Sequence, residues 1–140
     1  MRVSFEKLDY IDGLNVLEGV PFSGVVYEKG QDGGWDEISI IEGVESGISR
    51  EWYPSGILKL ERHMENNLIH GMKWEWDEVG NLLSESIFEY GIMVTSFKIT
   101  KWGEKKKVYQ INEGNPNYNN LLLFRKGRRS NFFSLPEARK

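Results

Sequence analysis

The side chains that most often perform chemistry are few or poorly placed in this sequence. There is no cysteine among the 140 residues, so neither a thiolate nor a disulfide can form. The two histidines, His63 and His70, do not stand in a metal-ligand spacing such as HExxH. No serine lies in a G-x-S-x-G motif, and no glycines form G-x-G-x-x-G or a P-loop. We therefore expect no catalytic residue, no cofactor and no metal site.

Acidic residues are abundant, and two pairs could be imagined as acid–base couples. These pairs are Glu75 with Asp77, and Glu61 with Glu85. A catalytic pair of carboxylates needs a pocket that pushes the two pKa values apart, and the sequence places neither pair in one. We interpret Glu61 and Glu85 as structural or solvated strand residues. We therefore expect a protein that is not an enzyme and has no small-molecule substrate.

Charge is distributed unevenly along the chain. Residues 1–90 carry 7 basic and 18 acidic side chains, whereas residues 91–140 carry 11 basic and 3 acidic ones. Such polarity guides association with charged partners. The acidic part suits a basic protein, and the basic part could contact nucleic acid or fold back onto the acidic part. Nucleic-acid binding is disfavoured because the acidic body repels the phosphate backbone.

The length suits a single domain over residues 1–140. The first ten residues, MRVSFEKLDY, lack the apolar run of a secretory signal. No stretch approaches the ~18 apolar residues of a membrane span. We therefore expect a cytoplasmic protein, and membrane contact is disfavoured because anionic lipids attract basic segments rather than an acidic body.

Three series of residues recur at a nearly fixed spacing, which is typical of repeat architectures. The first series has a spacing of 24 and contains Gly19, Gly43, Asn67 and Gly91. The second contains Gly24, Gly47 and Gly71, with Thr95 in the next slot. The third contains Gly33, Gly56, Gly80 and Gly103. We predict repeats at about 19–42, 43–66 and 67–90, a degenerate one at 91–114, and turns at Gly24, Gly33, Gly47, Gly56, Gly71 and Gly80.

Each repeat has the pattern of a β-hairpin. In residues 43–66, Ile48, Arg50 and Trp52 alternate with more polar positions, and the alternation resumes after the turn Pro54-Ser55-Gly56. One hairpin alone is marginal in water, so the copies must pair side by side. The sequence therefore predicts an all-β fold, an antiparallel meander of consecutive hairpins in an open, curved sheet.

The repeat resembles the bacterial variant of the MORN repeat. Its pattern of W-Y-x-x-G-x-L-x-x-E is carried by Arg50–Glu61 and more loosely by Lys73–Glu85. Asp12–Gly30, with Pro21-Phe22-Ser23-Gly24 inside it, is similar to the usual opening of such proteins. The resemblance covers roughly residues 10–91 and, more weakly, 92–111.

The resemblance implies two functions. Many bacterial proteins of this type are antitoxins or immunity proteins of toxin–antitoxin systems, which implies a chain that binds and neutralises a cognate toxin by protein–protein contact. A basic toxin that acts on nucleic acids would suit the acidic residues 1–90. The alternative is a MORN-like scaffold or adaptor that organises a protein assembly or touches a membrane, without a toxin partner.

The aromatic residues allow two interpretations. Aromatic side chains favour strands and are expected in the core of the sheet, but exposed tryptophans beside acidic residues would form binding hot spots. The predicted partner-binding residues are Glu51, Trp52, Trp74, Glu75, Trp76 and Asp77. Alternate residues of a strand point to opposite faces, so a partner would touch either the tryptophans or the acidic residues.

The repeat does not explain residues 115–140. We predict that the apolar run Leu121–Phe124 forms a strand that docks on the sheet. The basic cluster that follows is interpreted as a solvated turn, with phosphate contact as the alternative; it contains Arg125, Lys126, Arg128 and Arg129. A short helical turn is predicted near Leu135–Arg139, since Ser134 and Pro136 could start one.

Overall fold

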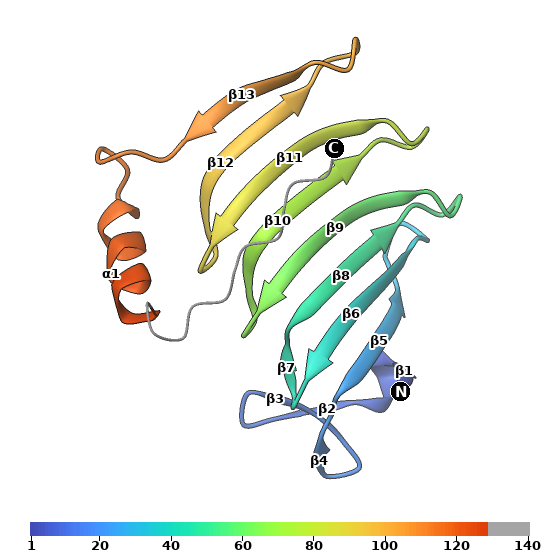
Figure 1. Cartoon of the computed structure of the whole chain (residues 1–140). Coiled ribbons are helices and arrows are strands. Elements are labelled where there is room, and N and C mark those ends of the chain that lie inside the picture. Colours follow the sequence, from blue (N-terminus) through green and yellow to red (C-terminus); the bar gives the residue numbers. More distant parts are fainter. Residues whose placement is uncertain (129–140) are drawn as a thin grey trace.

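The main feature of the fold is an open sheet of consecutive hairpins (Figure 1). The computed structural model describes residues 1–128. In this part of the chain the large sheet has ten strands. They are β1 (Arg2–Ser4), β5 (Gly24–Lys29), β6 (Trp35–Ile41), β7 (Val44–Glu45), β8 (Gly47–Trp52), β9 (Leu58–Glu65), β10 (Leu68–Trp76), β11 (Leu82–Glu89), β12 (Ile92–Ile99) and β13 (Lys105–Gln110). The predicted all-β meander is confirmed.

The strands follow one another across the sheet in the order β1-β5-β6-β8-β9-β10-β11-β12-β13, with β7 paired to β6. Every pair is antiparallel except β1 with β5, which run parallel. A separate three-stranded sheet of β2 (Asp9–Ile11), β3 (Leu14–Leu17) and β4 (Val20–Pro21) lies at the N-terminal end. The short helical turn η1 (Phe5–Lys7) precedes it. The sequence pattern predicted neither β1 nor this small sheet.

The third glycine series closes the hairpins. Gly33, Gly56, Gly80 and Gly103 all have a φ between 83° and 94°. The N–H of each donates to the carbonyl three residues earlier, as from Gly56 to Tyr53 at 2.8 Å. A residue with positive φ at the end of such a turn matches the twist of the flanking strands, and glycine takes that φ without a Cβ clash. These positions are turns, as predicted.

The first series lies in the two-residue turns between hairpins. Both central residues have positive φ in each turn, as in Glu42-Gly43 and Asn66-Asn67, which is the geometry of type I′ turns.

The second series does not lie in turns, so the prediction is wrong at these three positions. Gly24 and Gly47 begin β5 and β8, and Gly71 lies inside β10. Each pairs with a buried apolar residue on the next strand, and the three partners are Ile40, Met64 and Phe88. At Gly24 a Cβ would stand 2.3 Å from the carbonyl oxygen of Met1. The glycine therefore makes room for the backbone of β1.

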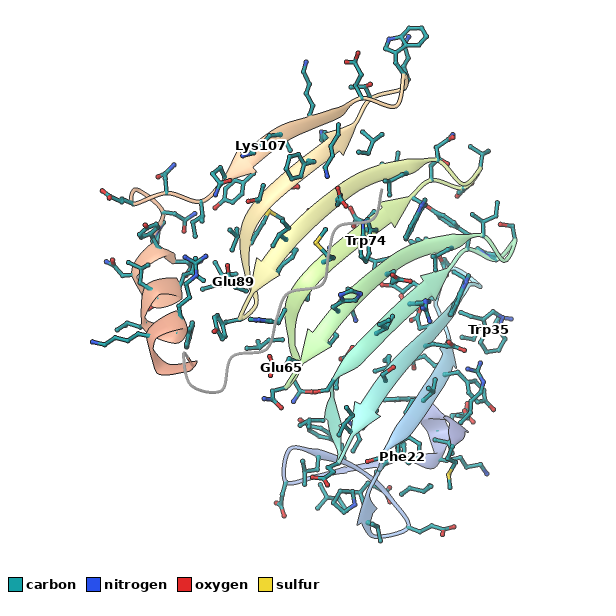
Figure 2. All side chains as sticks on the ribbon, in the orientation of Figure 1. Phe22, Trp35, Glu65, Trp74, Glu89 and Lys107 are labelled. Carbon is teal, nitrogen blue, oxygen red and sulfur yellow. The ribbon has the colours of Figure 1, made fainter. Side chains whose placement is uncertain are left out.

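Two apolar clusters cover the ends of the sheet. Phe22, Val26 and Ile40 pack beneath the small N-terminal sheet, with Leu8 and Leu17 against them. Figure 2 shows Phe22 at this end. At the other end, a second cluster joins the sheet to α1 (Tyr118–Arg128) and contains Tyr90, Ile111 and Leu121.

The helix α1 corrects the prediction for the tail. Leu121–Phe124 is helical rather than a strand, although Leu121 does dock on the sheet with no exposed surface. No helix among residues 1–128 is both long and apolar enough to cross a membrane. The predicted helical turn near Leu135–Arg139, and Arg129 of the basic cluster, lie outside the described residues.

Candidate protein-binding surface

One line of side chains crosses the sheet on a single face, because cross-strand neighbours share a face. We call it the paired row. It consists of Tyr27, Glu37, Arg50, Glu61, Trp74, Glu85, Phe97 and Lys107, each opposite the next. Figure 2 shows Trp74 over the middle of the sheet and Lys107 on its last strand.

The carboxylates of the paired row are neutralised within the fold. Glu61 is 1% exposed and accepts a hydrogen bond from Nε of Arg50 at 2.9 Å. Glu85 is 2% exposed and accepts from Nε1 of Trp74 at 3.0 Å, and it also forms an ion pair with Lys105. Buried carboxylates persist when they are paired in this way. The paired row is therefore part of the packing.

A second line crosses the opposite face and uses the residue next to the paired-row member on each strand. We call it the charged row. It consists of Glu28, Asp36, Glu51, Leu60, Glu75, Ser84, Lys98 and Lys106. Acidic residues occupy the end on β5, β6 and β8, and lysines occupy the end on β12 and β13. The acidic first part of the chain and its basic last part therefore place opposite charges at the two ends of the charged row.

The acidic end of the charged row is poorly compensated. Asp36 lies directly opposite Glu28 on one side and Glu51 on the other, and like charges in this relation destabilise a sheet. Neither Glu28 nor Asp36 has a hydrogen bond or ion pair from its side chain within residues 1–128. Glu51 forms a long ion pair with Arg62, with 3.9 Å between Oε2 and Nη1. Burial and the nearby Asp32 carboxylate raise the pKa of Asp36, and the charges of Lys59 and Arg62 offset only part of the rise.

A hollow of about 330 Å³ adjoins this acidic end. Asp36, Glu51 and Trp52 contribute to its lining, together with the turn that holds Asp32. Asp32 accepts a hydrogen bond from the N–H of Gly34 at 2.8 Å and from Nζ of Lys59 at 3.3 Å, and these bonds lower its pKa. Lys59 also lines the hollow, so acidic and basic side chains both face it.

The predicted partner-binding residues are thus divided between several environments. Glu51 and Trp52 meet at the hollow, whereas Glu75 lies further along the charged row and accepts from Oγ of Ser84 at 2.9 Å. Trp74 is 2% exposed and packs in the paired row. As predicted from alternation, Trp74 and Glu75 point to opposite faces.

The remaining two predicted residues hold the chain near a turn. The carbonyl of Trp76 accepts from the hydroxyl of Tyr53 at 2.7 Å. Asp77 accepts from the N–H groups of Asn81 and Val79, at 2.8 and 3.0 Å, and these bonds lower its pKa. Both residues have a structural use, and their contact with a partner stays a prediction.

Sequence reasoning missed Glu28, Asp36, Lys98 and Lys106. A signal for two of these positions was present, because Glu28 and Lys98 stand in the same slot of successive repeats as the predicted Glu51 and Glu75. The pairing of Asp36 with both neighbours depends on strand register, which the repeat alone does not give.

The two histidines pack within the sheet. His70 is 2% exposed, and its Nδ1 accepts the N–H of Tyr90 at 2.9 Å. His63 lies edge-on to Trp74, with ring centroids 5.4 Å apart. Within residues 1–128, no three side chains of His, Cys, Asp or Glu gather as metal ligands.

No protein-family model matches the chain, and no curated protein matches it either.

Proposed function

We propose that this protein is an antitoxin or immunity protein that binds a basic toxin through the acidic end of the charged row. The observation that carries the proposal is the set of three consecutive carboxylates, Glu28, Asp36 and Glu51, that face one another across β5, β6 and β8. The MORN-like pattern of the repeat supports the same class of function.

The buried carboxylates of the paired row have close donors, and Asp36 of the charged row has none among the described residues. Glu61 and Glu85 each have a donor at 2.9 to 3.0 Å, whereas Asp36 is placed between two like charges. Such an arrangement costs stability in the free protein. A partner that presents Lys or Arg would remove the repulsion on binding, so part of the binding energy comes from relief of that cost.

A toxin that acts on nucleic acids fits this surface best. Such an enzyme binds phosphates with clustered Lys and Arg side chains. Carboxylates on neighbouring strands are about 5 Å apart, which approaches the charge density of one nucleic-acid strand at about 3.4 Å per phosphate. The acidic end would therefore compete with the substrate of the toxin, and complementary charge would speed the encounter.

The test is co-expression with the product of the neighbouring gene. We expect that product to co-purify with the wild-type protein and to lose toxicity. The triple variant Glu28→Gln, Asp36→Asn, Glu51→Gln should lose capture and protection. The matched control Glu6→Gln, Glu18→Gln, Glu42→Gln removes the same charge from exposed sites elsewhere and should retain both. Equal behaviour of the two triples, or a neighbour that neither binds nor harms cells, would contradict the proposal.

A scaffold or adaptor is the alternative, and the mixed charge of the row favours it. Acidic and basic ends on one face would let two partners of opposite charge bind at once. Two partners captured together from separate purified components, with no toxic neighbour, would support this alternative.

A further inference from the structure

A second surface lies at the opposite end of the sheet, on β13. This is the last strand of the sheet order, and β12 pairs with only one of its sides (Figure 1). Within residues 1–128 no strand pairs with the outer side. An edge of this kind presents backbone N–H and C=O groups that can accept a further strand.

The β12–β13 hairpin carries uncompensated positive charge. Lys98 and Lys106 lie directly opposite each other, are exposed, and have no acidic partner in the described part of the chain. Like charges in this relation cost stability, as at the acidic end. The neighbouring lysines differ, because Lys105 pairs with Glu85 and lies 4.6 Å from the ring centroid of Phe97, where Lys107 also packs.

Apolar side chains are exposed on the same hairpin. Val108 is 52% exposed at a register shift, where one extra residue of β13 faces the pair Ser96 and Phe97. Trp102 is 78% exposed in the turn, with Nζ of Lys101 4.9 Å from its ring centroid. Positive charge, exposed apolar groups and an edge that no described strand covers therefore occur together on this hairpin.

We propose that the outer edge of β13 binds an extended acidic segment of another protein, which joins the sheet as an additional strand. Backbone hydrogen bonds along Lys105–Lys107 would supply affinity, and Lys98 and Lys106 would select acidic side chains on one face of the added strand. This surface is distinct from the acidic end of the charged row and does not depend on the toxin assigned to it.

The same charge keeps copies of the protein apart. Lysine on an edge strand discourages pairing between identical edges, because two β13 strands would bring two basic rows together. An acidic strand meets no such repulsion, so one set of lysines both excludes a second copy and admits the acidic segment.

The test uses a blocked nine-residue peptide of alternating Glu and Val and the full-length protein. We expect saturable binding by fluorescence anisotropy and slower amide hydrogen exchange in β13. The variant Lys98→Glu, Lys106→Glu should weaken binding by about tenfold or more, because it reverses the selecting charges. The control Lys7→Glu, Lys126→Glu makes the same charge change at exposed sites on η1 and α1 and should change binding less than about twofold.

Two further probes separate strand addition from simple charge attraction, using only the wild-type protein. The same peptide with alternate amides N-methylated keeps its charge but cannot pair with an edge, and it should not bind. Equal binding of both peptides would overturn the proposal. So would an oligothymidylate that binds more tightly than the peptide and displaces it, because the hairpin would then be a nucleic-acid site.

Discussion

A buried carboxylate needs hydrogen-bond donors, and the two faces of this sheet meet that need differently. Glu61 and Glu85 stand at the same slot of successive repeats, and each accepts a hydrogen bond from a side chain on the preceding strand. Asp36 is half-buried between like charges and accepts no hydrogen bond from the described residues. At the residue scale, the carboxylates of the paired row stabilise the fold, whereas Asp36 is left without a donor in the part of the chain that the structure describes.

Glu85→Ala should lower the free energy of unfolding by about 1–3 kcal/mol, because the buried Nε1–H of Trp74 loses its acceptor. Glu75→Ala is the matched control on the other face, where the carboxylate is 44% exposed, and it should cost less than about 0.5 kcal/mol. Urea unfolding of the two variants measures both values. Equal losses would show that Glu85 contributes no more than an exposed carboxylate.

Asp36→Asn should stabilise the free protein and weaken its capture of the basic partner. The raised pKa of Asp36 means that folding disfavours the ionised form. The wild-type stability at this site is therefore lower above the folded pKa and recovers as the pH falls through it. The side chain of Asn does not titrate, so the variant lacks this contribution to the pH dependence of stability. Thermal unfolding between pH 3 and 7 should give Asp36→Asn a higher melting temperature than wild type at pH 7, with a difference that shrinks as the pH falls. A difference that does not change with pH would contradict the assignment.

At the element scale, α1 shows where sequence patterns reach their limit. Four consecutive apolar residues, Leu121–Phe124, fit a buried strand and a helix equally well. Packing decides the outcome: Leu121 enters the cluster with Tyr90 and Ile111, and Arg125 makes two hydrogen bonds to Glu89, at 2.8 and 2.5 Å. Glu89 lies at the end of β11 that faces the helix (Figure 2). These partners come from far earlier in the chain, so a local window does not contain them.

Leu121→Ala should cost about 2–5 kcal/mol, because it leaves a cavity under the helix where the leucine has no exposed surface. Leu123→Ala makes the same chemical change on the same helix at a side chain that is 66% exposed, and it should cost well under about 1 kcal/mol. Urea unfolding of the two variants compares them directly. A similar cost for both would mean that α1 does not dock through Leu121.

The glycines show what the sequence determines and what it leaves open. A spacing of 23 or 24 residues predicted the hairpins and their turns, because turn residues with positive φ are strongly selected by type. The same periodicity does not distinguish turn glycines from glycines in strands, and Gly24, Gly47 and Gly71 lie inside or at the start of strands. The need for glycine at these positions depends on what packs against them, such as the backbone of Met1 at Gly24. The charged row was hidden for a similar reason, since it required the register between hairpins.

At the scale of the whole molecule, the large sheet is a chain of nearest-neighbour interfaces. Among residues 1–128, each hairpin pairs only with the hairpins beside it. The small N-terminal sheet packs at one end, and α1 packs at the other. Several of the most buried residues lie in the middle, on β9 and β10, and they include Glu61, His70, Met72 and Trp74. Stability in such an arrangement is close to a sum over units and interfaces. Opening at an end therefore breaks one interface, whereas opening in the middle breaks two.

Native-state hydrogen exchange should consequently be graded along the sheet. We expect amides of β9, β10 and β11 to exchange slowest, and those of β13 and of the small N-terminal sheet to exchange fastest, because opening at the ends requires the least free energy. Exchange measured by mass spectrometry at neutral pH and in low urea resolves these segments. Leu121→Ala should speed exchange in β12 and β13 while leaving β5 and β6 nearly unchanged, since the loss is confined to one end. Uniform protection, or an equal response of β5 and β6, would show that the sheet unfolds as one cooperative unit.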